Sequence, residues 1–109
     1  IGPHAFDRCN SLTSITFPDT LIKIGEEAFS KCISLSSIVF PESVTTIGYS
    51  AFVGCHRLTE VEIPATVRHI GDDAFANCEN LKYVRISSNF KDDINRIFSD
   101  CDLERVTFI

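Results

Sequence analysis

Cysteines, histidines and paired acidic residues are the side chains in this sequence whose types and spacing could support chemistry. Each of the five cysteines lies three residues after a phenylalanine and 23 residues from its neighbour in the series: Cys9, Cys32, Cys55, Cys78 and Cys101. So many cysteines in a short chain raise the question of a disulfide framework or a metal site. A zinc-type site requires close doublets such as Cys-x-x-Cys, and the sequence contains none.

The even spacing of the cysteines also argues against disulfide bonds. A residue that recurs once per repeat forms a column in stacked coils, with neighbours about 4.8 Å apart, one strand spacing. Side chains in such a column point the same way, and parallel Cβ vectors give poor disulfide geometry. We therefore expect free, buried thiols that act as small hydrophobic groups.

The histidines and acidic pairs suggest no catalytic or metal-binding arrangement. His4, His56 and His69 occupy three different positions of the repeat. Cys55 and His56 are adjacent, but adjacent side chains on a strand or helix point apart. Three acidic pairs recur along the chain: Glu26-Glu27, Asp72-Asp73 and Asp92-Asp93. Solvated surface charge is our interpretation of these pairs, with calcium ligation as the alternative. We predict no enzyme activity, no metal site and no cofactor.

The elements that position these residues come from a 23-residue repeat. An Ile-Gly step begins each unit, at residues 1, 24, 47 and 70, and a phenylalanine follows five residues after each isoleucine. A fixed period of 20 to 50 residues is the signature of repeat architectures. Each unit also contains the spacing Leu-x-x-Ile-x-Phe or a close variant, as at Leu35, Ile38 and Phe40. This β-branched, alternating run predicts a strand of about four to five residues.

The rest of each unit predicts a coil. Pro18, Pro41 and Pro64 close three of the strands, where the missing N–H does no harm. A second extended piece follows, at residues 21–24, 44–47 and 67–70, and the next glycine allows a bend with positive φ. The spacing Ala-Phe-x-x-Cys then favours one or two helical turns, of α or 3₁₀ type. Stacked coils bury one continuous core, and we expect the phenylalanines to stack inside it.

The last unit departs from the repeat. Asp93-Ile94 replaces the Ile-Gly step, and apolar residues at 94, 97, 98 and 101 have helical spacing. We predict a short helix near residues 93–100, with Asp92 or Asp93 able to cap its start. The final strand comes 22 residues after the previous one.

Composition limits the partners of the chain. Its 109 residues predict one domain, and the net charge of −5 comes without any basic stripe, which disfavours nucleic acid and anionic membranes. No apolar run is long enough for a membrane span, and no signal peptide is visible. The chain contains no methionine and begins inside a unit, so we expect residues 1–109, nearly five units, to be part of a longer protein.

The pattern I-G-x-x-A-F-x-x-C-x-x-L-x-x-I-x-F-P resembles the BspA-type leucine-rich repeat, over essentially the whole chain. The resemblance implies an α/β solenoid, a right-handed coil with a parallel sheet on its concave side, a short second strand and 3₁₀ or helical turns. Proteins of this family occur on the surface of bacteria and some parasitic protozoa, or are secreted. Several bind host matrix proteins such as fibronectin and fibrinogen.

Solenoids usually bind partners through the solvent-facing positions of the concave sheet. In the first two coils these positions are small and nearly neutral, whereas in the last three they form a charged patch with one aromatic residue: Glu60, Glu62, Tyr83, Arg85 and Arg105. Tyr and Arg are common at binding hot spots. The alternative is an ordinary solvated sheet, in which Glu62 and Arg85 only pair with each other.

Two functions remain open from the sequence. The first is a non-enzymatic protein-binding domain of a cell-surface or secreted protein, with adhesion to host or matrix proteins. The second is a structural spacer or self-associating stalk, with end-to-end assembly through the exposed edges of the terminal coils. A ligand that needs Tyr83 and Arg85 would distinguish them.

Overall fold

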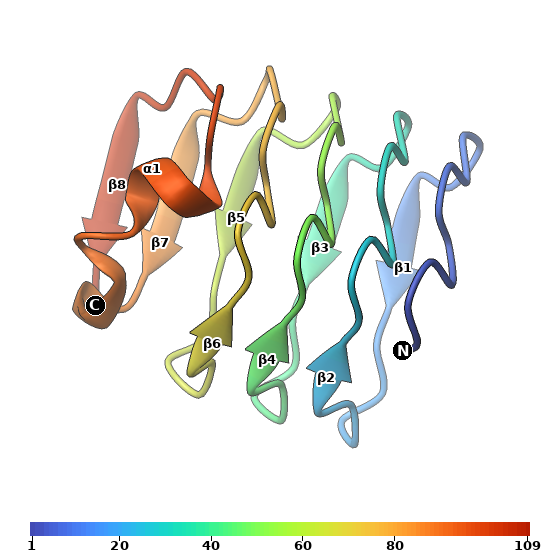
Figure 1. The fold of residues 1–109 in the computed structure, drawn as a ribbon, viewed down its shortest axis with the longest axis horizontal. Helices are drawn as coiled ribbons and strands as arrows, with labels where there is room; N and C mark the ends of the chain where they lie inside the picture. Colours follow the sequence, from blue (N-terminus) through green and yellow to red (C-terminus); the bar gives the residue numbers. More distant parts are fainter.

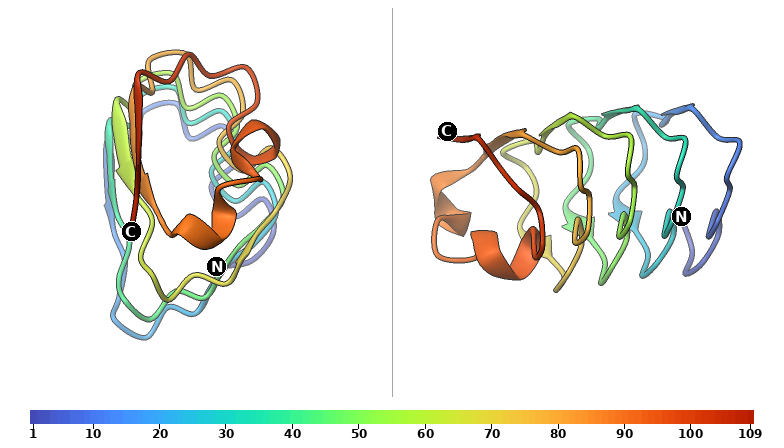
Figure 2. Two further views of the ribbon diagram at one scale, coloured as in Figure 1. Left: turned by 90° about the vertical axis from the view of Figure 1, so that its left-hand side faces the viewer. Right: turned by 90° about the horizontal axis from the view of Figure 1, so that it is seen from above.

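The computed structural model describes every residue from 1 to 109, and it shows a stack of coils joined by parallel strands (Figure 1). Seen along the stack, successive coils overlay one another (Figure 2). One side carries the five longer strands: β1 (Ser14–Thr16), β3 (Ser37–Val39), β5 (Glu60–Glu62), β7 (Tyr83–Ile86) and β8 (Arg105–Phe108). Another side carries three strands of two residues each: β2 (Lys23–Ile24), β4 (Thr46–Ile47) and β6 (His69–Ile70). The predicted parallel-sheet solenoid is confirmed, with longer strands of three to four residues.

The strand register follows the repeat. Ser14 pairs with Ser37 and Glu60 with Tyr83, each 23 residues apart, whereas Tyr83 pairs with Arg105, 22 residues on. Inward positions such as Val61 and Val84 are buried, and their neighbours along the strand face outward. We call the outward-facing surface of β1, β3, β5, β7 and β8 the strand face.

The sheet beneath the strand face is not continuous. β1 pairs with β3, and β5 pairs with β7 and β8, but no backbone hydrogen bond joins β3 to β5. The N–H groups of Ser36 and Lys82 donate to the preceding coil at 3.0 and 2.9 Å, whereas the equivalent N–H of Thr59 has no such partner. The break coincides with the end of the Phe17–Phe40 stack, where Ile63 takes the place of the aromatic ring.

The expected helical turns are single hydrogen-bonded turns. In the second coil, N–H groups of Ala28 and Ser30 donate to the carbonyls three residues earlier. Glu27 and Lys31 have φ of 51° and 56°, and such left-handed residues prevent the turns from joining into a helix. Equivalent positions repeat this geometry in other coils, and Gly54 is the one glycine with a positive φ.

The glycine of the Ile-Gly step serves close packing and not a bend with positive φ. A Cβ on Gly48 would lie 2.7 Å from backbone atoms of Gly25 and Glu26 in the preceding coil. No side chain could therefore be accommodated without separating the coils.

The C-terminal unit contains the helical structure. A 3₁₀ helix, η1, spans Ser88–Phe90, and α1 spans Ile94–Ile97, about half the length predicted. Asp93 lies at the N-cap of α1 but makes no side-chain capping bond. Its carboxylate lies 3.5 Å from Nε of Arg96 instead. None of the helices has the length and apolar composition needed to cross a bilayer.

The core is built on the phenylalanine column, as predicted. The rings of Phe6, Phe29, Phe52, Phe75 and Phe98 are stacked, with neighbouring centroids 5.1 to 5.4 Å apart. The middle three rings are fully buried. This stack holds the coils in register and so fixes the spacing of the strand face.

Candidate functional site

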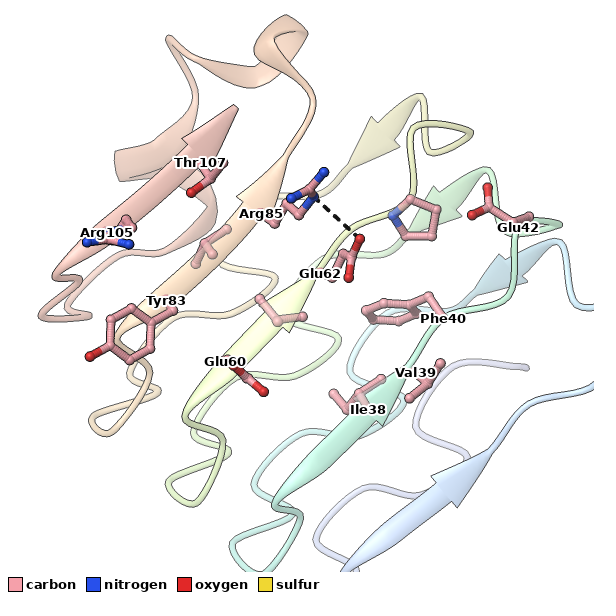
Figure 3. Close-up of a pocket in the computed structure, with 13 residues that line it drawn as sticks. Ile38, Val39, Phe40, Glu42, Glu60, Glu62, Tyr83, Arg85, Arg105 and Thr107 are labelled. Atoms are coloured by element: carbon pink, nitrogen blue, oxygen red, sulfur yellow. Dashed lines mark ion pairs between the residues drawn. The ribbon is translucent and has the colours of Figure 1, made fainter. Parts of the chain in front are cut away.

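The five side chains predicted as a binding face lie together on the strand face. They come from β5, β7 and β8, which the register aligns: Glu60 beside Tyr83 and Arg105 in one row, and Glu62 beside Arg85 in the next. All five line one hollow of about 530 Å³, open to solvent (Figure 3). The alternation of a strand points them outward, because Val61 and Val84 between them are held in the core.

The hollow extends further than the sequence prediction, onto β3 and the turns after β3 and β5. The residues that the prediction omitted include Val39, Phe40, Glu42 and Pro64. Val39 has 78% of its surface exposed, more than any other large hydrophobic residue of the chain. The sequence could have indicated Val39 as part of the site, because an aliphatic residue stands there at an outward position of the repeat. Nothing in the sequence indicates the break in the sheet next to it.

The charged groups of the hollow are only partly paired. Nε of Arg85 lies 3.5 Å from Oε1 of Glu62, with both side chains more than half exposed. Exposed pairs of this kind contribute about 0–1 kcal/mol, so a partner could displace this one at little cost. Glu42, Glu60 and Arg105 have no ion pair.

Tyr83 provides the aromatic surface of the site. Its hydroxyl group lies 3.2 Å from Oε2 of Glu104, and 48% of the residue remains exposed. The hydrogen bond fixes the direction of the ring while leaving one face available for contact. A fixed, half-exposed tyrosine loses little conformational entropy on binding.

The cysteines are free thiols, as predicted, and the middle three are buried. Each thiol from Cys32 onward donates to the carbonyl of a phenylalanine in the preceding coil, as from Cys55 to Phe29 O at 3.3 Å. Cys55 thus bonds to backbone and not to His56, whose Nδ1 faces Glu79 at 4.0 Å. Burial raises the pKa of the Cys55 thiol from 9.0 to about 12, so it carries no thiolate at neutral pH.

Some of the other titratable groups form ion pairs on the surface. His4 is 3.1 Å from the carboxylate of Glu27, and Arg96 bridges Asp72 and Asp93 at 3.0 and 3.5 Å. No group of three or more His, Cys, Asp or Glu side chains has a geometry that could hold a metal ion.

Comparison with known proteins gives a family for the whole chain. Residues 1–109 match the family described as "BspA type Leucine rich repeat region", in six copies. No curated protein matches the chain. Solved structures with the same fold include a leucine-rich repeat protein from Bacteroides ovatus, with 38% identity and a TM-score of 0.80 over 95% of this chain and 27% of that one.

Two further structures are similar. A leucine rich cell surface protein from Faecalibacterium prausnitzii has 33% identity and a TM-score of 0.85, over 99% of this chain and 29% of that one. The pneumococcal vaccine antigen PcpA has 31% identity and a TM-score of 0.75, over 80% of this chain and 22% of that one. The chain thus spans less than a third of the length of these proteins.

Proposed function

Because this chain belongs to the BspA-type leucine-rich repeat family, we propose that it is a non-enzymatic protein-binding domain of a cell-surface or secreted protein, with an adhesion role. Its partner in this proposal is a host or extracellular-matrix protein, bound through the strand face. Repeat solenoids present extended surfaces of this kind, made by equivalent positions of successive coils.

The observation that carries the proposal is the hollow of the strand face. It combines an exposed aliphatic side chain, Val39, with a half-exposed tyrosine and charged groups that are unpaired or weakly paired. Tyr83 and Arg85 both lie on β7, between β5 and β8 (Figure 3), and are residue types enriched at binding hot spots. Such a surface gains more from contact with a protein than a uniformly solvated sheet would.

The surface location rests on the similar proteins. One of them is described as a cell surface protein and another as a vaccine antigen. These descriptions belong to proteins more than three times as long as this chain, and they support the location proposed here by analogy.

Binding to a panel of immobilised extracellular-matrix proteins tests the proposal. We expect the wild-type chain to bind at least one of them saturably, and the double variant Tyr83→Ala/Arg85→Ala to bind it at least about 30-fold more weakly, as for a hot-spot pair. The matched control is Tyr49→Ala/Arg68→Ala, which removes an exposed tyrosine and an exposed arginine outside the strand face. This control should bind like the wild type.

Equal losses in both variants would show that contact with the matrix is non-specific. Unchanged folding of each variant is established by its thermal melt. A wild-type chain that binds no matrix protein but sediments as concentration-dependent polymers would favour the spacer or stalk alternative.

A further inference from the structure

The hollow lies over the break between β3 and β5, where no backbone hydrogen bond joins the two strands. Elsewhere on the strand face neighbouring strands are hydrogen bonded, but here the facing edges of two strands leave backbone groups without protein partners, among them the Thr59 N–H. The hollow overlies this break and is lined from both sides of it, by Val39 and Phe40 on one side and Glu60 and Glu62 on the other. The two strands still lie side by side across the break, so a segment that binds here lies over the strand face and contacts its side chains.

The side chains around the break form an apolar patch bounded by acids. Val39 is exposed, while Phe40 and Pro64, which also line the hollow, are buried and therefore held in place by their packing. Glu60 and Glu42 lie at the two ends of the part of the hollow that borders the break, with Phe40 and Glu62 between them (Figure 3). The carboxylates of Glu42 and Glu60 are exposed and form no ion pair, whereas Glu62 forms an ion pair with Arg85.

We propose that the hollow over the β3–β5 break binds an extended segment of a partner protein that carries lysine or arginine on both sides of an aliphatic residue. The cationic groups meet the carboxylates of Glu42 and Glu60, and the aliphatic residue and the long methylene stems cover Val39. This inference rests on the proposed function, because it names the partner surface that the same site would take.

The unpaired charges next to Val39 favour a cationic ligand. A nucleic-acid strand or an acidic peptide at this place would bring negative charge against Glu42 and Glu60, whereas the cations of the hollow, Arg85 and Arg105, come from β7 and β8. In an extended segment, residues i and i+2 point to the same side, so a Lys-x-Val-x-Lys pattern places both cations and the aliphatic group on one face. This spacing defines the probe.

The test is a titration of the ¹⁵N-labelled chain with the peptide acetyl-Lys-Ser-Val-Ser-Lys-amide, followed by NMR. We expect saturable shifts of the amide signals of β3 and β5, together with Thr59. The variant Glu42→Gln/Glu60→Gln should bind about three- to tenfold more weakly, as expected for the loss of two exposed ion pairs. Val39→Thr, which preserves shape but adds a hydroxyl group, should also weaken binding, and high salt should weaken it further.

Two controls make the result specific. Glu26→Gln/Asp92→Asn changes the net charge equally at exposed, unpaired acids outside the hollow and should leave the affinity unchanged. The peptide with glutamate in place of both lysines should not bind. Equal affinity of the two double variants, shifts outside β3 and β5, or no saturable binding of the lysine peptide would overturn the inference.

These outcomes are separable from the test of the proposed function. If the matrix protein binds through Tyr83 and Arg85 but the lysine peptide does not bind, this inference fails and the proposed function stands. If the peptide binds the hollow but no matrix protein binds, the inference stands and the proposed function loses its matrix partner.

Discussion

At the scale of single residues, the repeated cysteine is a packing group with one hydrogen bond. Its thiol donates to a phenylalanine carbonyl of the preceding coil, so it links two coils while filling a small apolar space. Burial favours the neutral form and raises the pKa of Cys32 as well as that of Cys55. The thiols of Cys32 and Cys55, which look reactive in the sequence, are therefore held in the unreactive neutral form in the structure.

The raised pKa of Cys55 predicts alkaline destabilisation. Its folded-state pKa of about 12 exceeds the ordinary 9.0, so its contribution to stability is complete below pH 9 and is lost as the pH rises toward 12. The slope for this thiol is at most about 1.4 kcal/mol per pH unit. Chemical denaturation from pH 8 to 11 should show a shallower loss for Cys55→Ser, which donates to the same carbonyl but does not titrate. Parallel curves for the two proteins would contradict the assignment.

At the scale of elements, the longer strands differ in how they are joined. β5 and β7 form a regular parallel pair, whereas β3 and β5 are held together by the core and the turns alone. The strand face is thus two short sheets that meet at a break.

Hydrogen exchange should detect this break directly. The Lys82 amide donates to Thr59 O at 2.9 Å, whereas the Thr59 amide has no acceptor. Both residues occupy the same position of the repeat, directly before a longer strand. We expect Thr59 to exchange at least about tenfold faster than Lys82, since protection follows hydrogen bonding and local stability. Equal protection of the two amides, measured by NMR at the same pH, would show that the sheet is continuous.

At the scale of the whole molecule, stability comes from contact between neighbouring coils. The stacked phenylalanine rings run through the chain, and each interior ring contacts one ring before it and one after it. The stability of a repeat array of this kind comes largely from the contacts between neighbouring coils. Loss of an interior ring therefore removes contacts with two coils at once.

Phe52→Ala should therefore be far more damaging than Phe6→Ala. Phe52 is fully buried between two rings, and the substitution should cost about 3–5 kcal/mol through lost burial and a residual cavity. Phe6 is 36% exposed and stacks on one ring, so its loss should cost well under half as much. Thermal melts of the two variants check this, with a fall in Tm of at least about 12 °C expected for Phe52→Ala. A Phe52→Ala melt that matches the wild type would overturn the core assignment.

The sequence by itself determined the repeat, the parallel strands, the stacked rings, the free thiols and which side chains face outward, because these follow from residues that recur at a fixed period. Local periodicity also placed Glu60, Glu62, Tyr83, Arg85 and Arg105 on one face. Only the tertiary structure decided how far the coils approach one another. That approach explains the glycine column, and the tertiary structure also located the break between β3 and β5, because contact between coils depends on residues 23 positions apart and not on any local pattern.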